Sequence, residues 1–153
     1  MSGKDRDLAK AKKTVENVVK ELGVEPADNA VEAVKGGYAW QIARGSADVI
    51  ISLIPGVHEA AGRIRVVSPL VRMEKGVTKE LAVRLLELNG TELPGVSFGL
   101  ISGDIVVLVA ERSVLELDKQ EVREMLGLIG YYADKYDDVL VKEFGGTRVC
   151  DLK

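Results

Sequence analysis

Few side chains in this sequence belong to the types that catalyse reactions or bind metals. His58 is the only histidine, which excludes a metal site with two histidine ligands and a histidine relay. It stands beside Glu59, shortly after Pro55-Gly56. A general base needs a positioned partner inside a cleft, and adjacency in sequence provides neither. We therefore interpret His58 as an exposed loop residue.

Asp134, Asp137 and Asp138 are spaced three and four residues apart, so they share one face of a helix. Their oxygens could hold a hard cation weakly. Lys135 and Lys142 are close in sequence, and a solvated acidic face beside these lysines is the simpler interpretation. We expect neither a metal site nor a cofactor.

The remaining reactive groups also predict little chemistry. The single cysteine, Cys150, excludes an internal disulfide and a thiolate-rich zinc site, which suits a reducing compartment. We interpret it as a free thiol, with an intermolecular bridge under oxidation as the alternative. Tyr131, Tyr132 and Tyr136 could stack on nucleobases, but no basic groove accompanies them.

Charge is spread evenly along the 153 residues, which hold 21 basic and 24 acidic side chains. No third of the chain is net positive, whereas nucleic-acid binding usually draws on a basic face. The longest stretch without a charged residue is 93–103, well short of the roughly 20 residues of a membrane-spanning helix. The first 20 residues lack the apolar region of a secretory signal. We expect a cytoplasmic protein that binds neither nucleic acid nor membrane.

The elements that position these residues follow from hydrophobic periodicity. Apolar residues spaced by three and four predict an amphipathic helix over 5–22. The stretch 25–37 is ambiguous, and a short helix through Val34 is possible before Gly36-Gly37 ends it. Alternation of apolar residues then predicts three strands, over 38–43, 49–54 and 63–71. Their short connections predict an antiparallel meander.

The second half alternates in the same way. Thr78 is a good N-cap for a helix that Asn89-Gly90 closes, and a tight hairpin at Gly103-Asp104 joins strands over 96–102 and 105–111. Asp118 and Glu121 form a capping box for the last helix, which two glycines end at 145–146. The tail over about 145–153 is loose, or forms a late strand. The prediction is a single α+β domain over 1–153, ordered α-β-β-β-α-β-β-α, with a five-stranded antiparallel sheet flanked by helices.

Short motifs within 78–140 resemble the YbjN-like family, whose members are described as bacterial sensory transduction regulators. That family shares the fold of the class I type III secretion chaperones, which has this element order, and residues 5–75 match in element order. The motifs are Leu85-Leu86-Glu87-Leu88-Asn89, Leu93-Pro94, Phe98-Gly99-Leu100, Gly103, Ile105 to Val109, Leu117-Asp118 and Ala133-Asp134-Lys135-Tyr136.

The resemblance implies a non-enzymatic homodimer that binds a segment of another protein. In the chaperones the dimer forms largely through the middle helix, and the partner wraps over apolar patches near the first helix and first three strands. Secretion chaperones are generally more acidic than this chain, which places it nearer the regulator-like branch. The dimer-interface candidates are Leu81, Leu85 and Leu88; the partner-binding candidates are Val15, Val18, Tyr38, Trp40 and Ile42.

Each assignment has a simpler alternative. Trp40 and Tyr38 suit binding anchors, yet both could face the core of their own domain. The three leucines of the middle helix could pack on the sheet instead of a second copy. At the level of function, a small-molecule sensor or enzyme with a pocket between sheet and helix is the alternative from a different class. A structural adaptor with a permanent partner differs from the leading hypothesis only in lifetime.

Overall fold

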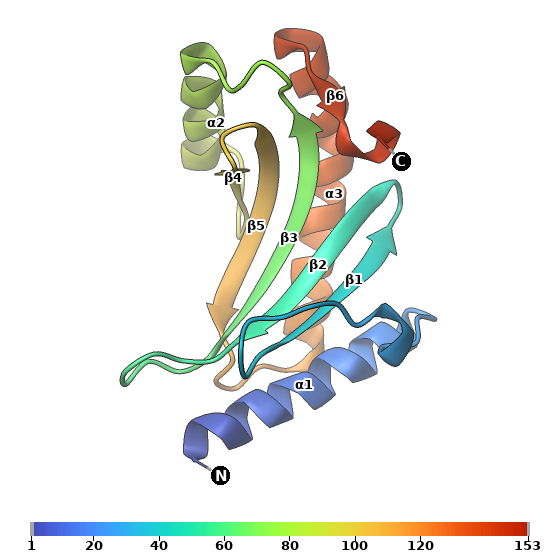
Figure 1. The fold of residues 1–153 in the computed structure, drawn as a ribbon, viewed down its shortest axis with the longest axis vertical. Coiled ribbons are helices and arrows are strands. Elements are labelled where there is room, and N and C mark those ends of the chain that lie inside the picture. Colours follow the sequence, from blue (N-terminus) through green and yellow to red (C-terminus); the bar gives the residue numbers. More distant parts are fainter. Residues whose placement is uncertain (1, 153) are drawn as a thin grey trace.

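The fold is built from three helices and one twisted sheet (Figure 1), in a computed structural model that describes residues 2–152. The helices are α1 (Gly3–Glu21), α2 (Lys79–Thr91) and α3 (Lys119–Phe144), and two short 3₁₀ turns are η1 (Ala27–Asn29) and η2 (Val149–Leu152). The strands are β1 (Tyr38–Arg44), β2 (Ala47–Ile54), β3 (Arg63–Arg72), β4 (Ser97–Ile101), β5 (Ile105–Ser113) and β6 (Thr147–Arg148). The predicted α+β class and element order are confirmed.

Every strand pair in the sheet is antiparallel, in the order β1-β2-β3-β5-β4. The prediction of five strands was wrong, because β6 pairs with β3 as a sixth. β2 pairs with β3 only as far as Val67, so the remaining part of β3 has a free edge on that side. The C-terminal tail fills this edge at Val71 and Arg72. Of the two alternatives for the tail, the late strand is the one observed.

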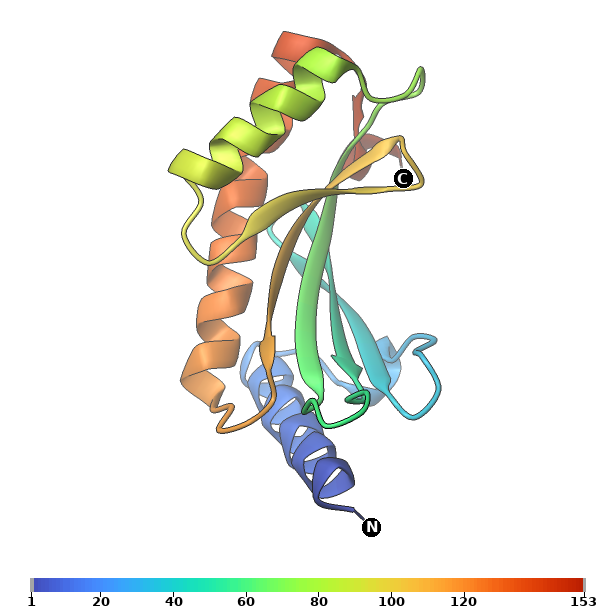
Figure 2. The ribbon, with the colours of Figure 1, turned by 90° about the vertical axis from the view of Figure 1, so that its left-hand side faces the viewer.

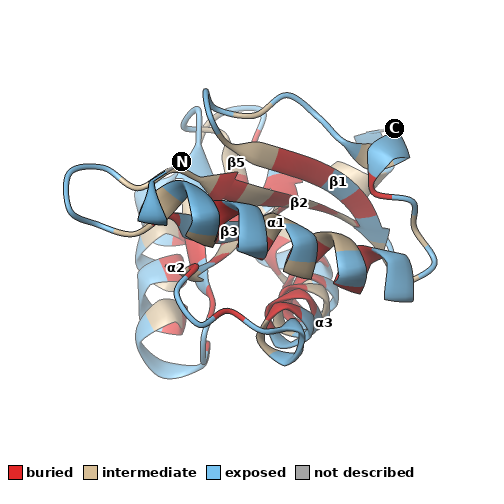
Figure 3. Cartoon of the chain, turned by 90° about the horizontal axis from the view of Figure 1, so that it is seen from below, coloured by how far each residue is buried: buried red, intermediate tan, exposed pale blue. Residues whose placement is uncertain are grey.

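The helices lie on one side of the sheet, and the long α3 runs along it (Figure 2). α1 lies across one end of the sheet, where it contacts α3 and β2. Figure 3 shows the chain from that end, with buried residues on β1 and β2 and on the parts of the helices that face the sheet. The alternating burial along β2 sends Ala47, Val49, Ile51 and Leu53 into this core. Among residues 2–152, no helix combines the length and apolar character needed to cross a membrane.

Local capping signals set the starts of α1 and α3. Asp118 caps α3, where Glu121 N–H donates to Asp118 Oδ1 (2.8 Å) and Asp118 N–H donates back to Glu121 Oε1 (3.4 Å), as predicted. An equivalent box between Ser2 and Asp5 starts α1 at Gly3, two residues before the predicted start. These side chains satisfy amides that the helix itself leaves without partners.

The end of α2 was predicted at Asn89-Gly90, but the helix continues to Thr91. The Asn89 side chain is occupied by the edge of β4: it accepts from Phe98 N–H (2.7 Å) and donates to the Phe98 carbonyl (3.3 Å). One turn further, the Tyr136 hydroxyl donates to Glu92 (2.8 Å), and burial together with this bond raises the pKa of Tyr136 to about 12. Asn89 therefore takes the place of a neighbouring strand at the β4 edge.

Asn89→Ala is expected to lower the free energy of unfolding by about 2 kcal/mol, because it leaves the Phe98 amide and carbonyl without partners in a part-buried place. Urea denaturation measures this difference. Gly90→Ala is the matched control: a Cβ at Gly90 meets no atom within 4 Å. In a helix this change should be neutral or stabilising by up to about 1 kcal/mol. Equal stability of Asn89→Ala and wild type would show that the side chain does not hold this edge.

Candidate functional site

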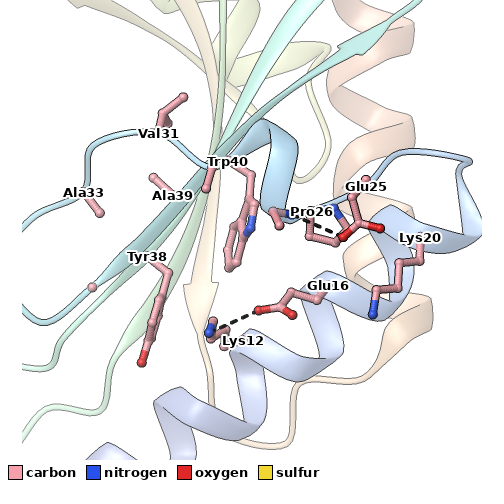
Figure 4. A pocket seen from close by; sticks show the side chains of 13 residues that line it. Lys12, Glu16, Lys20, Glu25, Pro26, Val31, Ala33, Tyr38, Ala39 and Trp40 are labelled. Atoms are coloured by element: carbon pink, nitrogen blue, oxygen red, sulfur yellow. Dashed lines mark hydrogen bonds and ion pairs between the residues drawn. The ribbon is translucent and has the colours of Figure 1, made fainter.

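A groove of about 370 Å³ lies between α1 and β1 at the edge of the sheet (Figure 4). Three segments supply its walls: α1, the stretch between α1 and β1, and the first residues of β1. A pocket between helix and sheet is what the sensor or enzyme alternative also requires, although that alternative named no particular helix or strand. The lining residues are Lys12, Glu16, Lys20, Glu25, Pro26, Ala27, Ala30, Val31, Ala33, Gly37, Tyr38, Ala39 and Trp40.

An aromatic pair forms one wall of the groove. Tyr38 stacks on Trp40 with ring centroids 6.4 Å apart and an interplanar angle of 20°. From α1, Lys12 Nζ lies 4.8 Å from the centroid of the Tyr38 ring and 3.4 Å from Glu16 Oε1. A cation over an aromatic face contributes about 0.5–1 kcal/mol at an exposed site. The pair therefore presents apolar surface, while Lys12 and Glu16 place charges of both signs beside it.

The structure separates the five partner-binding candidates into one surface residue and four core residues. Tyr38 is half-buried and lines the groove. Val15 and Val18 are fully buried, and Trp40 and Ile42 are each 3% exposed. Trp40 still borders the groove, but most of its surface packs in the core. Burial therefore favours the core alternative for every candidate except Tyr38.

The dimer candidates on α2 are also covered by their own chain. Leu81, Leu85 and Leu88 are 0%, 5% and 2% exposed, which favours packing within the domain. The opposite face of the helix exposes Val83 (44%) and Leu86 (69%). The spacing that identified the buried stripe set Leu86 beside it, and in the structure Leu86 is exposed.

Val83 belongs to a second groove, of about 440 Å³, where α2 approaches the end of α3. Phe144 of α3 lines it, and the charged residues around it come from α2. Those charged residues are Lys79, Glu80, Arg84 and Glu87.

Asp137 and Asp138 of α3 pair with Arg148, which the sequence analysis did not identify as their partner. Arg148 of β6 lies 2.9 Å from Asp138 Oδ1 and 4.0 Å from Asp137 Oδ2. Lys135 instead stands over two tyrosine rings. Burial raises the pKa of the Asp137 carboxyl above its ordinary value. Within residues 2–152, no three His, Cys, Asp or Glu side chains are arranged to hold a metal ion.

The fold is similar to solved type III secretion chaperones. A chain of the ExsC–ExsE complex superposes with a TM-score of 0.61 at 13% identity, covering 87% of this chain and 95% of that chain. The Yersinia pestis secretion chaperone SycH, solved with a fragment of YscM2, gives 0.52 at 16% identity and coverages of 82% and 98%. The HopA1–SchA chaperone–effector complex gives 0.55 at 13% identity and coverages of 83% and 92%.

At these identities the structural matches establish the fold. Curated protein sequences contain no significant match. A family model does match, over residues 9–152, and it therefore covers α1 from Ala9 onward, both other helices and the whole sheet. The match includes every residue of both grooves. The chain belongs to the TY-Chap1 family, the type III secretion (YopN, CesT) and YbjN peptide-binding chaperones.

Proposed function

We propose that this protein is a non-enzymatic chaperone or regulator that binds a segment of another protein in the groove between α1 and β1. The observation that supports it best is the half-exposed Tyr38, stacked on Trp40 along an edge strand. Family membership supports the same function, and similar structures were solved as complexes of chaperones with their effectors. The bound segment comes from a partner protein, in the reducing environment of the cytoplasm that a single free thiol suits.

The groove suits a polypeptide better than a reacting small molecule. Among residues 2–152, its lining includes no histidine, cysteine, serine or threonine; its ionisable side chains are those of Lys12, Glu16, Lys20, Glu25 and Tyr38, and Lys12 pairs with Glu16. An edge strand can hydrogen-bond an extended segment through its main chain, while neighbouring side chains select what is bound. Tyrosine is enriched among the residues that dominate binding energy, because it combines large apolar area with a polar end.

Tyr38→Ala is expected to weaken peptide binding about tenfold or more, because it removes the anchor from the groove wall. The probe is a 15-residue peptide selected from a displayed random library on the immobilised wild-type chain, and fluorescence anisotropy measures its Kd. Tyr131→Ala is the matched control, since Tyr131 is 62% exposed on α3 and does not line the groove. Equal affinity of both variants for every selected peptide would place the binding site elsewhere.

We further propose that the protein is a homodimer formed through the exposed face of α2. Val83 and Leu86 supply the apolar contact, and the groove against Phe144 receives side chains of the second copy. The charges on this face are self-complementary. An antiparallel pairing of two α2 helices about a two-fold axis at Val83 brings Lys79 of one copy opposite Glu87 of the other.

A further inference from the structure

The segment 27–34, here called the strap, lies along the outer edge of β1. Sequence alone allowed a helix through Val34, but the strap contains only the 3₁₀ turn η1. It then meets β1 in a single antiparallel bridge between Ala30 and Trp40. Val31 N–H donates to the Ala39 carbonyl (3.0 Å), a group that points away from β2. Figure 4 shows Val31 and Ala33 beside Ala39 and Tyr38. The strap thus occupies part of a strand edge that would otherwise be open.

The strap is held loosely. In the described chain, one backbone hydrogen bond of normal geometry joins it to β1. None of its residues is buried, and its two valines are 41% (Val31) and 57% (Val34) exposed. A segment with few buried apolar contacts is drawn from the part of a protein that opens at low cost. The two valines bury only part of their apolar surface in this position, which is consistent with a segment that can leave it.

Space flanks the bridge on both sides. The groove with Tyr38 and Trp40 lies on one side of the bridge. On the other side, the strap and the end of β1 line a further groove of about 360 Å³, distinct from the groove at α2 and Phe144. That groove includes Gln41 and Ala43, whose main chain continues the outer edge of β1. The edge therefore extends beyond the bridge in the direction of Ala43, where an added strand would find further partners.

We propose that the strap is an in-chain occupant of the β1 edge, and that it leaves when an extended segment of a partner protein pairs with β1 as an added strand. This inference rests on the proposed function and names how the same site is regulated. The strap shows what the edge accepts. It places small Ala30 opposite Trp40, with β-branched Val31 next to it, and it carries Asp28 and Glu32 but no basic residue.

The groove wall across from the strap carries charges of both signs, Lys12 and Lys20 with Glu16, all from α1. The partner segment is accordingly extended and rich in small and β-branched residues, as the strap is. Removal of the strap also uncovers Trp40 and Ala39, which line the groove together with it. The buried state of Trp40 therefore belongs to the closed form, and Trp40 gains exposure when the strap leaves.

Val31→Pro tests the proposal by removing the one donor that holds the strap. Ala30 has φ −66° and ψ 136°, a conformation that a residue before proline readily adopts. Trp40 is the only tryptophan, so fluorescence reports on it directly. Val31→Pro is expected to shift its emission to longer wavelength and to raise acrylamide quenching about threefold, because the open form becomes populated. Val31→Ala keeps the amide and is the matched control, with emission close to wild type.

A labelled peptide with the sequence of residues 24–36 serves as the binding probe. It is expected to bind Val31→Pro about tenfold more tightly than wild type, because the in-chain competitor no longer lowers its apparent affinity. If Val31→Pro loses its native circular dichroism spectrum, a chain with Gly-Ser-Gly-Ser at 31–34 replaces it, with the same expected shifts.

Identical quenching and peptide affinity in Val31→Pro, Val31→Ala and wild type would overturn the proposal. That result would leave the proposed function in place if Tyr38→Ala still weakens the library-selected peptides. Failure of Tyr38→Ala to weaken them would instead contradict the site itself. The two experiments therefore distinguish a wrong regulatory device from a wrong binding site.

Discussion

Trp40→Ala is expected to lower the free energy of unfolding by about 3–5 kcal/mol, the usual cost of removing a large buried aromatic side chain. Trp40 is 3% exposed and belongs to the main hydrophobic core. Its neighbours on the same face of β1 and β2, Ile42 and Ile51, are buried as well. The cavity left by an indole is too large for these side chains to fill without strain. Chemical denaturation monitored by circular dichroism measures the change.

The control for Trp40→Ala is Tyr131→Ala, which removes an aromatic ring from an exposed site and should change stability by less than about 0.5 kcal/mol. Near-native stability of Trp40→Ala together with lost peptide binding would mean that Trp40 is a surface anchor in solution. The closed groove would then be the minor form.

Leu86→Asp is expected to convert the dimer to a monomer, with a dimerisation Kd raised about 100-fold or more. Leu86 is 69% exposed, the most open large apolar side chain on α2. In the proposed antiparallel pairing, position 86 of one copy lies opposite Glu80 of the other, so a carboxylate at this position would place two like charges together in the interface, which is costly. Stability of the isolated fold should change little, because the side chain contacts solvent there.

Light scattering coupled to size-exclusion chromatography measures the mass at micromolar concentration. The wild-type chain should give twice 16.5 kDa and Leu86→Asp 16.5 kDa. Leu115→Asp is the matched control, because Leu115 is 48% exposed and lies outside α2. A wild-type chain that stays monomeric, or a Leu86→Asp chain that stays dimeric, would contradict the α2 interface.

The parts of the fold that sequence predicted well depend on local signals. Asp118 and Glu121 are three residues apart, so their reciprocal capping can be recognised without any knowledge of tertiary structure. The end of α2 could not be predicted in this way. An asparagine followed by glycine usually ends a helix. Here the side-chain amide of Asn89 instead hydrogen-bonds the backbone of Phe98, nine residues further along and on a strand edge. A tertiary contact overrode the local preference.

The sixth strand shows a second limit. β6 has two residues, Thr147 and Arg148, and two residues show no periodicity. Its place depends on the mismatch in length between β2 and β3, which is a property of the assembled sheet. Arg148 likewise pairs with the carboxylates of α3 only after the tail has docked. The sequence analysis noted only Lys135 and Lys142, which are close in sequence, and it did not predict the contact with Arg148.

The structure places a groove beside Tyr38 and Trp40, and peptide binding there stays a prediction. Periodicity identifies apolar faces, and it cannot tell a face that packs inside the domain from one that contacts a partner. That is why Trp40 was named together with Tyr38, although only Tyr38 lies at the surface. The strap was not predicted because its residues show no hydrophobic periodicity. The signal that could have found it is the pair of valines, Val31 and Val34, just before the two glycines that lead into β1.

Hydrogen–deuterium exchange of the protein with and without a library-selected peptide tests the central claim most directly. Binding in the groove should slow amide exchange at Gln41 and Ala43, on the outer edge of β1, because the added strand accepts their hydrogen bonds. Exchange in the strap should become faster in the same complex. Protection confined to α2, with unchanged exchange along β1, would contradict the claim that this edge and its groove form the peptide-binding site.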